Sequence, residues 1–335
     1  MRILVLNAGN LADVVQMLPA FSDAKHAFPH IAIDVVVDER WAQVPSWHPA
    51  VDRVFTLAVK DWRIGMLSLV ASNELKRLRI QLRKHAYDWV VDLHGNWLSA
   101  WFSRSFNTNS VGFSRLNDKK KTYSFLYNQK IPAQCNLHRV EQIRRLFSEG
   151  INYKITYPNC FYSLDANSFC QGCDNSVVLC FGCKDNKQRY PAALGRQLIQ
   201  NLVDQGLRVK LLWRDAESGS YVKSMAEGIS SVEIMPKLSL SGIAAVMVQA
   251  RAIVTVNNGL SHLAAALGIP TVCLLGPKSD LNTAAKGANQ LKIIEIHSPG
   301  FDYPPAKIQT EINDLIDQYP SICYSTEFFM QKSTA

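Results

Sequence analysis

The residue best placed for chemistry is Asp13, within the first twenty residues of the chain. A short apolar run from Arg2 to Leu6 leads into small and polar residues from Asn7 to Ala12, and apolar residues then recur at helical spacing. This order predicts a strand, a tight loop and a helix. Substrates of open α/β sheets bind beyond the carboxyl ends of the strands, so a carboxylate in this loop is positioned for catalysis. The alternative is that Asp13 only caps the helix that follows.

Further strands must position this loop. Apolar runs at residues 31–37, 53–59 and 89–93 alternate with helical patterns, which predicts a parallel, doubly wound sheet. Polar residues follow two of these runs, Asp38 and Glu39 after one and His94 to Asn96 after another. Because parallel strands end at one edge, these residues and Asp13 are expected to share a site.

A second alternation begins after residue 175. Its predicted strands are residues 176–181, 208–213, 232–235, 252–256 and 271–275, and its predicted helices are residues 192–205, 216–228, 240–249 and 260–267. The stretch 151–175 has no sustained period and is expected to be a linker. We therefore expect an α/β protein of two facing domains, residues 1–150 and 176–320, with a ligand in the cleft between them and a tail at 321–335.

The sharpest motif of the second half runs from Asn257 to Gly268. An apolar strand enters a turn at Gly259 and then an alanine-rich helix, whose free amides at residues 258–261 would bind an anion or a diphosphate. A lone His262 at a helix start is more often a structural residue than a ligand contact. The next strand ends in Gly276-Pro277-Lys278, which would add a cation at the same edge.

Composition indicates a folded protein and excludes several classes. The chain has 335 residues, of which 47% are hydrophobic and 19% charged. The first apolar run is too short for a signal peptide, and no stretch approaches the roughly 20 apolar residues of a membrane span, so we expect a cytoplasmic protein. Neither an RNA-binding aromatic signature nor a helix-turn-helix pattern is present, which disfavours nucleic acid as a partner.

The net charge of +8 is unevenly distributed. Residues 60–145 contain sixteen Lys and Arg but only six Asp and Glu. Such a surplus attracts phosphates, anionic sugars, nucleic acid or the inner membrane surface. The alternative is that residues 73–84 form the solvated face of a helix. That explanation does not extend to Lys119, Lys120 and Lys121, which lie in a predicted loop.

Four of the eight cysteines form two C-x-x-C pairs, Cys170 with Cys173 and Cys180 with Cys183. Four converging thiolates would bind zinc. However, the six residues between the pairs are fewer than in zinc fingers, and part of this stretch reads as a buried strand. We therefore expect free thiols in the core and loops, and no metal.

Several of these stretches together resemble glycosyltransferase family 9, the heptosyltransferases of lipopolysaccharide core assembly. The resemblance is carried by residues 1–20 with Asp13, by residues 35–54 with the run Trp-Ala-Gln-Val-Pro-Ser-Trp-His-Pro-Ala-Val-Asp-Arg-Val, and by residues 125–130, 257–267 and Gly276-Pro277. It covers nearly the whole chain. The family resemblance implies a GT-B fold and an inverting transfer that needs neither metal nor cofactor.

The resemblance also implies the substrates. The donor would be ADP-L-glycero-D-manno-heptose and the acceptor Kdo2-lipid A, with Asp13 as the general base on the acceptor hydroxyl. The protein would be a monomer bound peripherally at the inner face of the inner membrane. The residues expected to bind the acceptor are Asn10, Lys60, Arg63, His94, Asn96, Lys119, Lys120 and His138.

The donor side departs from the family pattern. The family has Gly before the catalytic Asp and Asp at the start of the nucleotide motif, where this chain has Ala12 and Asn257. The residues expected to bind the donor are Gly182, Cys183, Lys187, Arg189, Glu217, Asn257, Asn258, Gly259, Leu260, Ser261, His262 and Lys278. Two hypotheses therefore stay open, an active transferase with an altered donor pocket and a homologue that binds a glycolipid or a protein without transfer.

Overall fold

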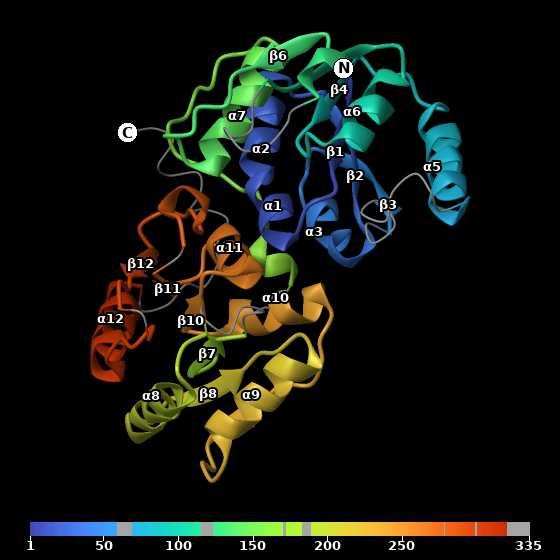
Figure 1. The fold of residues 1–335 in the computed structure, drawn as a ribbon. Coiled ribbons are helices and arrows are strands. Elements are labelled where there is room, and N and C mark those ends of the chain that lie inside the picture. Colours follow the sequence, from blue (N-terminus) through green and yellow to red (C-terminus); the bar gives the residue numbers. More distant parts are fainter. Residues whose placement is uncertain are drawn as a thin grey trace. The chain divides into compact units, whose positions relative to one another are not determined.

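The structure is a computed structural model that describes residues 1–58, 69–114, 123–169, 172–182, 189–277, 279–298 and 300–319 (Figure 1). The chain forms two compact units that divide between Ser163 and Leu164. Each unit contains one six-stranded parallel sheet with helices on both faces, so each is an α/β unit.

The first sheet has the strand order β3-β2-β1-β4-β5-β6. Its strands are β1 (Arg2–Asn7), β2 (Ala32–Asp38), β3 (Val51–Leu57), β4 (Trp89–Asp92), β5 (Asn109–Phe113) and β6 (Gln129–Ile131). The order reverses between β1 and β4, which pair directly with Leu6 opposite Asp92. Rossmann-like sheets bind their ligands at such a reversal, at the carboxyl ends of the two strands.

Helices cover both faces of the first sheet (Figure 1). They are α1 (Leu11–Gln16), α2 (Leu18–Ala27), α3 (Gln43–Ser46), α5 (Leu69–Leu82), α6 (Trp97–Arg104) and α7 (Arg139–Gly150). Leu4 and Leu6 of β1 pack on one face with Leu78 of α5 and Phe102 of α6. On the other face α2 and α7 pack against each other, and α7 contacts β5 and β6.

The second sheet repeats this topology, with the order β12-β11-β10-β7-β8-β9. Its strands are β7 (Ser176–Cys180), β8 (Arg208–Leu211), β9 (Val232–Ile234), β10 (Ala252–Val256), β11 (Thr271–Leu275) and β12 (Leu291–Glu295). The helices are α8 (Ala192–Asp204), α9 (Ala216–Ala226), α10 (Leu240–Gln249), α11 (Gly259–Ala266) and α12 (Pro305–Gln318). α12 packs on α8, whereas α10 and α11 contact each other and the strands β7 and β10. The reversal falls between β7 and β10, as it does between β1 and β4.

Nine predicted strands have counterparts in the structure, but three observed strands escaped the sequence analysis. These are β5, β6 and β12. β6 has three residues, and β5 and β12 carry Asn, Ser, Lys or Glu among their apolar residues. In such short, partly polar segments the alternation of apolar and polar residues is too brief to predict a strand. They become strands because a neighbouring strand offers free backbone hydrogen-bonding groups at its edge.

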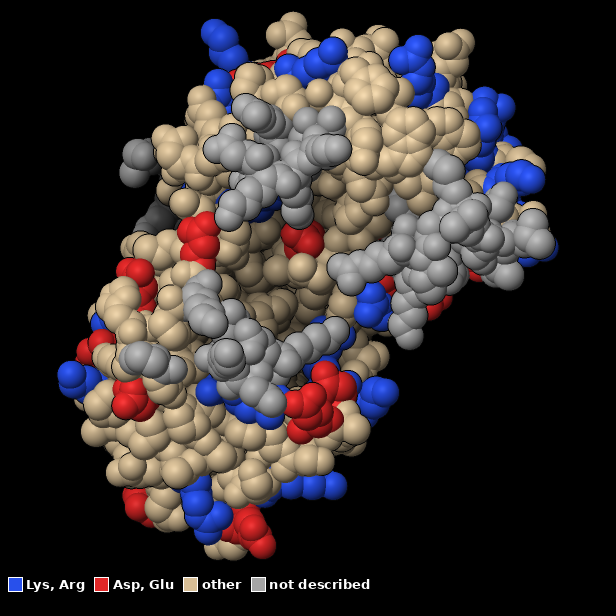
Figure 2. Space-filling view, in the orientation of Figure 1, with Lys and Arg blue, Asp and Glu red and all other residues tan. Residues whose placement is uncertain are grey.

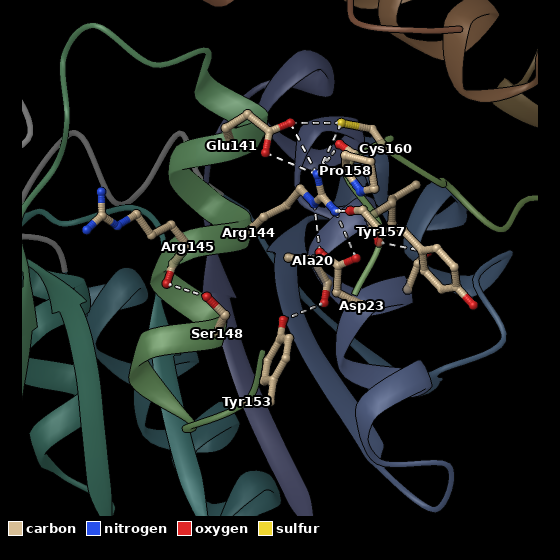
Figure 3. Close-up of polar contacts among 12 residues, drawn as sticks. Ala20, Asp23, Glu141, Arg144, Arg145, Ser148, Tyr153, Tyr157, Pro158 and Cys160 are labelled. Atoms are coloured by element: carbon tan, nitrogen blue, oxygen red, sulfur yellow. Dashed lines mark hydrogen bonds and ion pairs between the residues drawn. The ribbon is translucent and has the colours of Figure 1, made fainter. Parts of the chain in front are cut away.

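A buried arginine ties the end of the first unit to its helices (Figure 3). Arg144 of α7 donates to both carboxylate oxygens of Asp23 on α2, at 2.7 and 3.1 Å, and to the carbonyl oxygens of Tyr157 and Pro158. Tyr153 also donates to the carbonyl oxygen of Ala20. These bonds hold residues 153–158, part of the predicted linker, against the first unit.

The excess positive charge belongs to the first unit. Residues 1–163 contain 21 Lys and Arg against 13 Asp and Glu, whereas residues 164–335 contain 15 of each. On the face shown in Figure 2, Lys and Arg side chains stand around the first unit with few acidic neighbours, and the second unit carries both signs. Among the described residues, no helix combines the length and the apolar character needed to cross a membrane.

Candidate functional site

Asp13 lies in the first turn of α1, at the carboxyl end of β1. Asn10 is the N-cap of this helix, because its Oδ1 accepts from the amides of Ala12 and Asp13 at 2.8 and 3.3 Å. Asp13 Oδ2 in turn accepts from the amide of Asn10 at 2.9 Å, which completes a capping box. Asp13 Oδ1 accepts no hydrogen bond from the described residues, so one carboxylate oxygen caps the helix while the other is available to a ligand.

The loop before α1 holds this carboxylate closely. The buried Asn7 donates from Nδ2 to the carbonyl oxygen of Asp13 at 3.0 Å and accepts from the amide of Gly9 at 3.1 Å. A Cβ atom on Gly9 would lie 2.4 Å from Asp13 Oδ2. Gly9 therefore has to lack a side chain for Asp13 to keep its position.

The loop after β4 lies beside the loop after β1. Asp92 is fully buried, and its Oδ1 accepts from the amides of His94 and Gly95 at 2.9 and 3.0 Å. Tyr127 donates to Asp92 Oδ2 at 2.7 Å. Burial and the Asp92 carboxylate both raise the pKa of Tyr127, which keeps this bond intact at neutral pH. The buried carboxylate thus fixes the loop that carries the predicted residues His94 and Asn96.

A third group, Arg139, joins this edge from the start of α7. Its guanidinium donates to the carbonyl oxygen of Leu93 at 3.3 Å and stands over the ring of Phe113 at 5.0 Å. Burial lowers the pKa of Arg139, and the negative charge of Asp13 acts in the opposite direction. Arg139 is therefore a partly buried cation within electrostatic reach of the Asp13 carboxylate.

Arg139 was missed by the sequence analysis, although the sequence contained a signal for it. A cation in the first turn of a helix faces the positive end of the helix dipole, which is unfavourable. A nearby negative charge offsets this cost, and Asp13 supplies one. The Asp13 carboxylate, the amide-rich start of α6 and Arg139 form an edge suited to an anionic ligand carrying a hydroxyl.

Three residues predicted to bind the acceptor are helix N-caps. They are Asn10 for α1, Asn96 for α6, whose side chain accepts from the amide of Ser99 at 2.7 Å, and His138 for α7, whose Nδ1 accepts from the amide of Val140 at 3.2 Å. Their first role is structural. Of the other predicted acceptor residues, His94 lies in the loop after β4, and Lys60, Arg63, Lys119 and Lys120 lie outside the described residues.

The second unit has a matching turn at the end of β10. Asn258 is the N-cap of α11, and its Nδ2 donates to the carbonyl oxygen of Gly182, after β7, at 3.0 Å. A Cβ atom on Gly182 would lie 3.0 Å from the Cβ of Ser218 in α9. The ends of β7 and β10 and the start of α9 therefore meet closely at the reversal of the second sheet.

The expectation of free amides at residues 258–261 is wrong for three of the four positions. Asn258 Oδ1 accepts from the amides of Leu260 and Ser261 at 2.8 and 3.3 Å, and Ser261 Oγ accepts from the amide of Asn258. The capping box uses these donors because Asn and Ser compete well for the first amides of a helix. Leu260, Ser261 and His262 are also buried, which leaves Gly259 as the residue of this turn whose amide the cap does not use.

Asn257 presents the clearest unsatisfied group of the second unit. Its Oδ1 atom is buried, and no hydrogen-bond donor among the described residues reaches it. A buried acceptor without a donor is costly unless a ligand or a water supplies the bond. Asn257 stands at the carboxyl end of β10, so a hydroxyl or amino group of a ligand at this edge would satisfy it.

Arg189 and Glu217 form an ion pair, with Nη2 and Oε1 2.9 Å apart. The guanidinium of Arg189 also stacks over the ring of Tyr221 at 4.8 Å. Glu217 is next to Ser218, and Ser218 lies against Gly182, whose carbonyl oxygen accepts from Asn258. The ion pair therefore lies beside the turn that begins α11. The predicted donor-binding residues Cys183, Lys187 and Lys278 lie outside the described residues.

The two described cysteines of the predicted cluster differ in setting. Cys173 is exposed, whereas Cys180 lies buried in β7, where burial raises the pKa of its thiol. Cys170 and Cys183 lie outside the described residues. Among the residues that the structure describes, no group of three or more His, Cys, Asp or Glu is arranged to hold a metal ion.

Comparison with known proteins decides the family. The model of glycosyltransferase family 9 (heptosyltransferase) matches residues 75–305. Lipopolysaccharide heptosyltransferase 1 of Pseudomonas aeruginosa is 34% identical over 309 residues, which cover 91% of this chain and 85% of that protein. The chain belongs to glycosyltransferase family 9.

Solved structures of this family agree with the fold. The structure of E. coli heptosyltransferase WaaC with ADP matches with a TM-score of 0.85 and 31% identity over 94% of this chain and 100% of that one. WaaC with ADP-2-deoxy-2-fluoro heptose matches with a TM-score of 0.83 and 31% identity over 94% of this chain and 99% of that one. This family member therefore has the predicted GT-B fold of two Rossmann-like domains, and it is a glycosyltransferase.

Proposed function

We propose that this chain transfers L-glycero-D-manno-heptose from its ADP-activated form to Kdo2-lipid A, the first heptose step of lipopolysaccharide inner-core synthesis. The observation that carries the proposal is the similarity to lipopolysaccharide heptosyltransferase 1 over 91% of the chain. Asp13, where the strand order of the first sheet reverses, supports the same reaction. Its Oδ2 accepts from the Asn10 amide, which leaves Oδ1 available, and an inverting transfer needs one base at the acceptor hydroxyl.

In this proposal Asp13 Oδ1 accepts the proton of the attacking hydroxyl. The acceptor oxygen forms a bond to the anomeric carbon of the heptose from the face opposite the departing phosphate, and the bond from that carbon to the phosphate oxygen breaks. The capping bond from the Asn10 amide to Oδ2 fixes the orientation of the carboxylate, so that Oδ1 faces the substrate. Arg139 compensates the negative charge of Asp13 and of an anionic acceptor.

The second unit would bind the nucleotide sugar. Gly259 offers an amide at the start of α11 to the diphosphate, where the helix dipole favours negative charge. Asn257 Oδ1 would accept a hydrogen bond from a hydroxyl or amino group of the nucleotide sugar. This buried oxygen would then have the hydrogen-bond partner that it lacks among the described residues. Cations from Arg189, Lys187 or Lys278 would stabilise the departing ADP.

The acceptor is a membrane lipid, which leads us to propose a peripheral monomer at the inner face of the inner membrane. The positive charge of residues 1–163 supports attraction to an anionic surface. Sedimentation of the purified protein tests the monomer.

Transfer to an acyl-free Kdo2 acceptor in solution tests the function directly. Asp13→Asn keeps an oxygen for the Asn10 amide but cannot take a proton, so kcat should fall by at least about 100-fold. Glu149→Gln, an exposed carboxylate on the same unit, is the matched control and should transfer normally. Transfer by Asp13→Asn at the wild-type rate would contradict the base assignment.

The second hypothesis is a chain that binds an anionic glycolipid or a protein without transfer. Neutral Asn257 and the occupied amides of the α11 turn favour it, because both weaken the attraction for a diphosphate. Calorimetry with ADP separates the two hypotheses, since absence of nucleotide binding together with absence of transfer would exclude the enzyme.

A further inference from the structure

One face of α6 exposes large aromatic side chains to solvent. Trp97 and Trp101 are 39% and 43% exposed, and Arg104 continues the same stripe because the three residues are four and three positions apart. Phe125 of the neighbouring 3-10 turn is 63% exposed. Tryptophans in a row along one helix leave a large apolar area exposed to water, so this face is expected to contact a partner.

The helix that carries the stripe is firmly held. Ala100 and Phe102 on its inner side are buried, and Phe102 packs against Phe106 with ring centroids 5.3 Å apart. Trp97 contacts the edge of Tyr123 at 5.4 Å. The aromatic stripe is therefore presented by a rigid element rather than by a loose end of the chain.

Cationic side chains border the stripe at the carboxyl end of α6. Arg83 donates to the carbonyl oxygen of Ser105 at 2.7 Å, which brings α5 against the end of α6 next to Arg104. Lys76 and Ile80 lie on the exposed side of α5, and Ile80 is 63% exposed. Figure 2 shows Lys and Arg side chains at the border of the part of the first unit where α5 and α6 lie. The surface thus combines apolar rings with positive charge.

We propose that this surface, Trp97, Trp101, Arg104 and Phe125 with Arg83, is where the protein docks on an anionic lipid bilayer. Indole rings favour the boundary between headgroups and acyl chains, because one side of the ring is apolar and its N–H stays hydrated. Arginine at the same level pairs with lipid phosphates. The proposal rests on the proposed function, since an enzyme acting on a lipid acceptor must reach the bilayer surface, and the net charge of residues 1–163 has the sign that this surface requires.

Vesicle binding tests the proposal with the full-length protein. The probe is vesicles of phosphatidylcholine mixed with phosphatidylglycerol, separated from free protein by sedimentation. The Trp97→Ala/Trp101→Ala variant should bind at least about tenfold more weakly, because the apolar area of two rings stays in water. Arg104→Gln should weaken binding by about fivefold, and added salt should reduce this difference. Trp97→Phe/Trp101→Phe should retain most of the binding.

Leu281→Ala is the matched control, because Leu281 is a 45% exposed apolar residue of the second unit, and it should bind as the wild type does. Wild-type binding by the double Ala variant, or absence of binding by the wild type, would overturn the proposal. So would a dimer of the wild-type protein that the double Ala variant loses, because the stripe would then bind a second copy.

Transfer assays keep this proposal distinct from the proposed function. On an acyl-free Kdo2 acceptor in solution, Trp101→Ala, one helical turn beyond the start of α6, should retain the wild-type rate, which also shows that it is folded. On Kdo2-lipid A in vesicles, it should lose rate in proportion to its binding. Failure of the wild type to use the acyl-free acceptor would count against the proposed function, whatever the vesicle binding.

Discussion

Replacing Arg144 by Met tests how the buried charge cluster of the first unit is balanced. The substitution keeps the aliphatic part of a side chain that is 1% exposed and removes its guanidinium. Asp23, itself 6% exposed, would lose two charge-assisted hydrogen bonds, and the carbonyl oxygens of Tyr157 and Pro158 would lose their donor (Figure 3).

The loss should be large and dependent on pH. Breaking a buried ion pair from one side costs about 3–5 kcal/mol, because the remaining charge is buried without compensation. Burial already raises the pKa of Asp23, while Arg144 acts against that rise. Without Arg144 the carboxyl group can escape the penalty only by binding a proton. The variant should therefore lose more stability at pH 7 than at pH 4.5, since a raised pKa in the folded state favours folding at low pH.

Urea unfolding followed by tryptophan fluorescence measures this effect in the right unit, because six of the seven tryptophans lie within residues 1–163. The double variant Asp23→Leu/Arg144→Met removes the buried charge of Asp23 and should recover most of the lost free energy, because Glu141, the other carboxylate paired with Arg144, is 25% exposed. An equally unstable double variant, with a loss that does not change with pH, would refute the explanation by charge and leave packing as the cause.

Three further predictions concern the first unit. Arg139→Met should lower kcat/KM for transfer by at least about tenfold, because the partly buried cation that balances the Asp13 charge is lost, whereas Arg145→Met, whose side chain on the same helix is 39% exposed, should not change it. Burial, followed by the charge of Lys25, lowers the pKa of His48 to about 3, so the folded state excludes a proton that the unfolded chain binds below about pH 6.5. Stability should thus fall by about 2 kcal/mol from pH 7 to pH 5, and His48→Gln should flatten this part of the pH profile. Gly9→Ala should displace Asp13 and depress kcat more than KM, with Gly300→Ala, whose methyl group meets nothing closer than 3.5 Å, as its control.

Local patterns in the sequence predicted most of the strands and the loops that follow them. The run from Arg2 to Asp13 gives strand, loop and helix from residue types alone, and β10 with the start of α11 does the same around Asn257. Residue types alone predict that both loops lie at sheet edges, because βα units place such loops at one edge. The alternation of strands and helices likewise predicts the α/β class.

Tertiary structure decided which groups are available at these edges. Asp13 Oδ2 accepts a hydrogen bond and Oδ1 does not because only Oδ2 lies close to the Asn10 amide. The amides at the start of α11 are occupied because the rotamer of Asn258 turns its Oδ1 toward them. Arg139 reaches Leu93 across 46 positions of sequence, and Arg144 reaches Asp23 across 121. Sequence patterns report on neighbours along the chain, whereas these contacts arise when the sheet brings distant helix ends together. The sequence therefore determined which loops lie at the carboxyl edges of the two sheets, and packing determined the charge and the hydrogen bonds that Asp13 meets there.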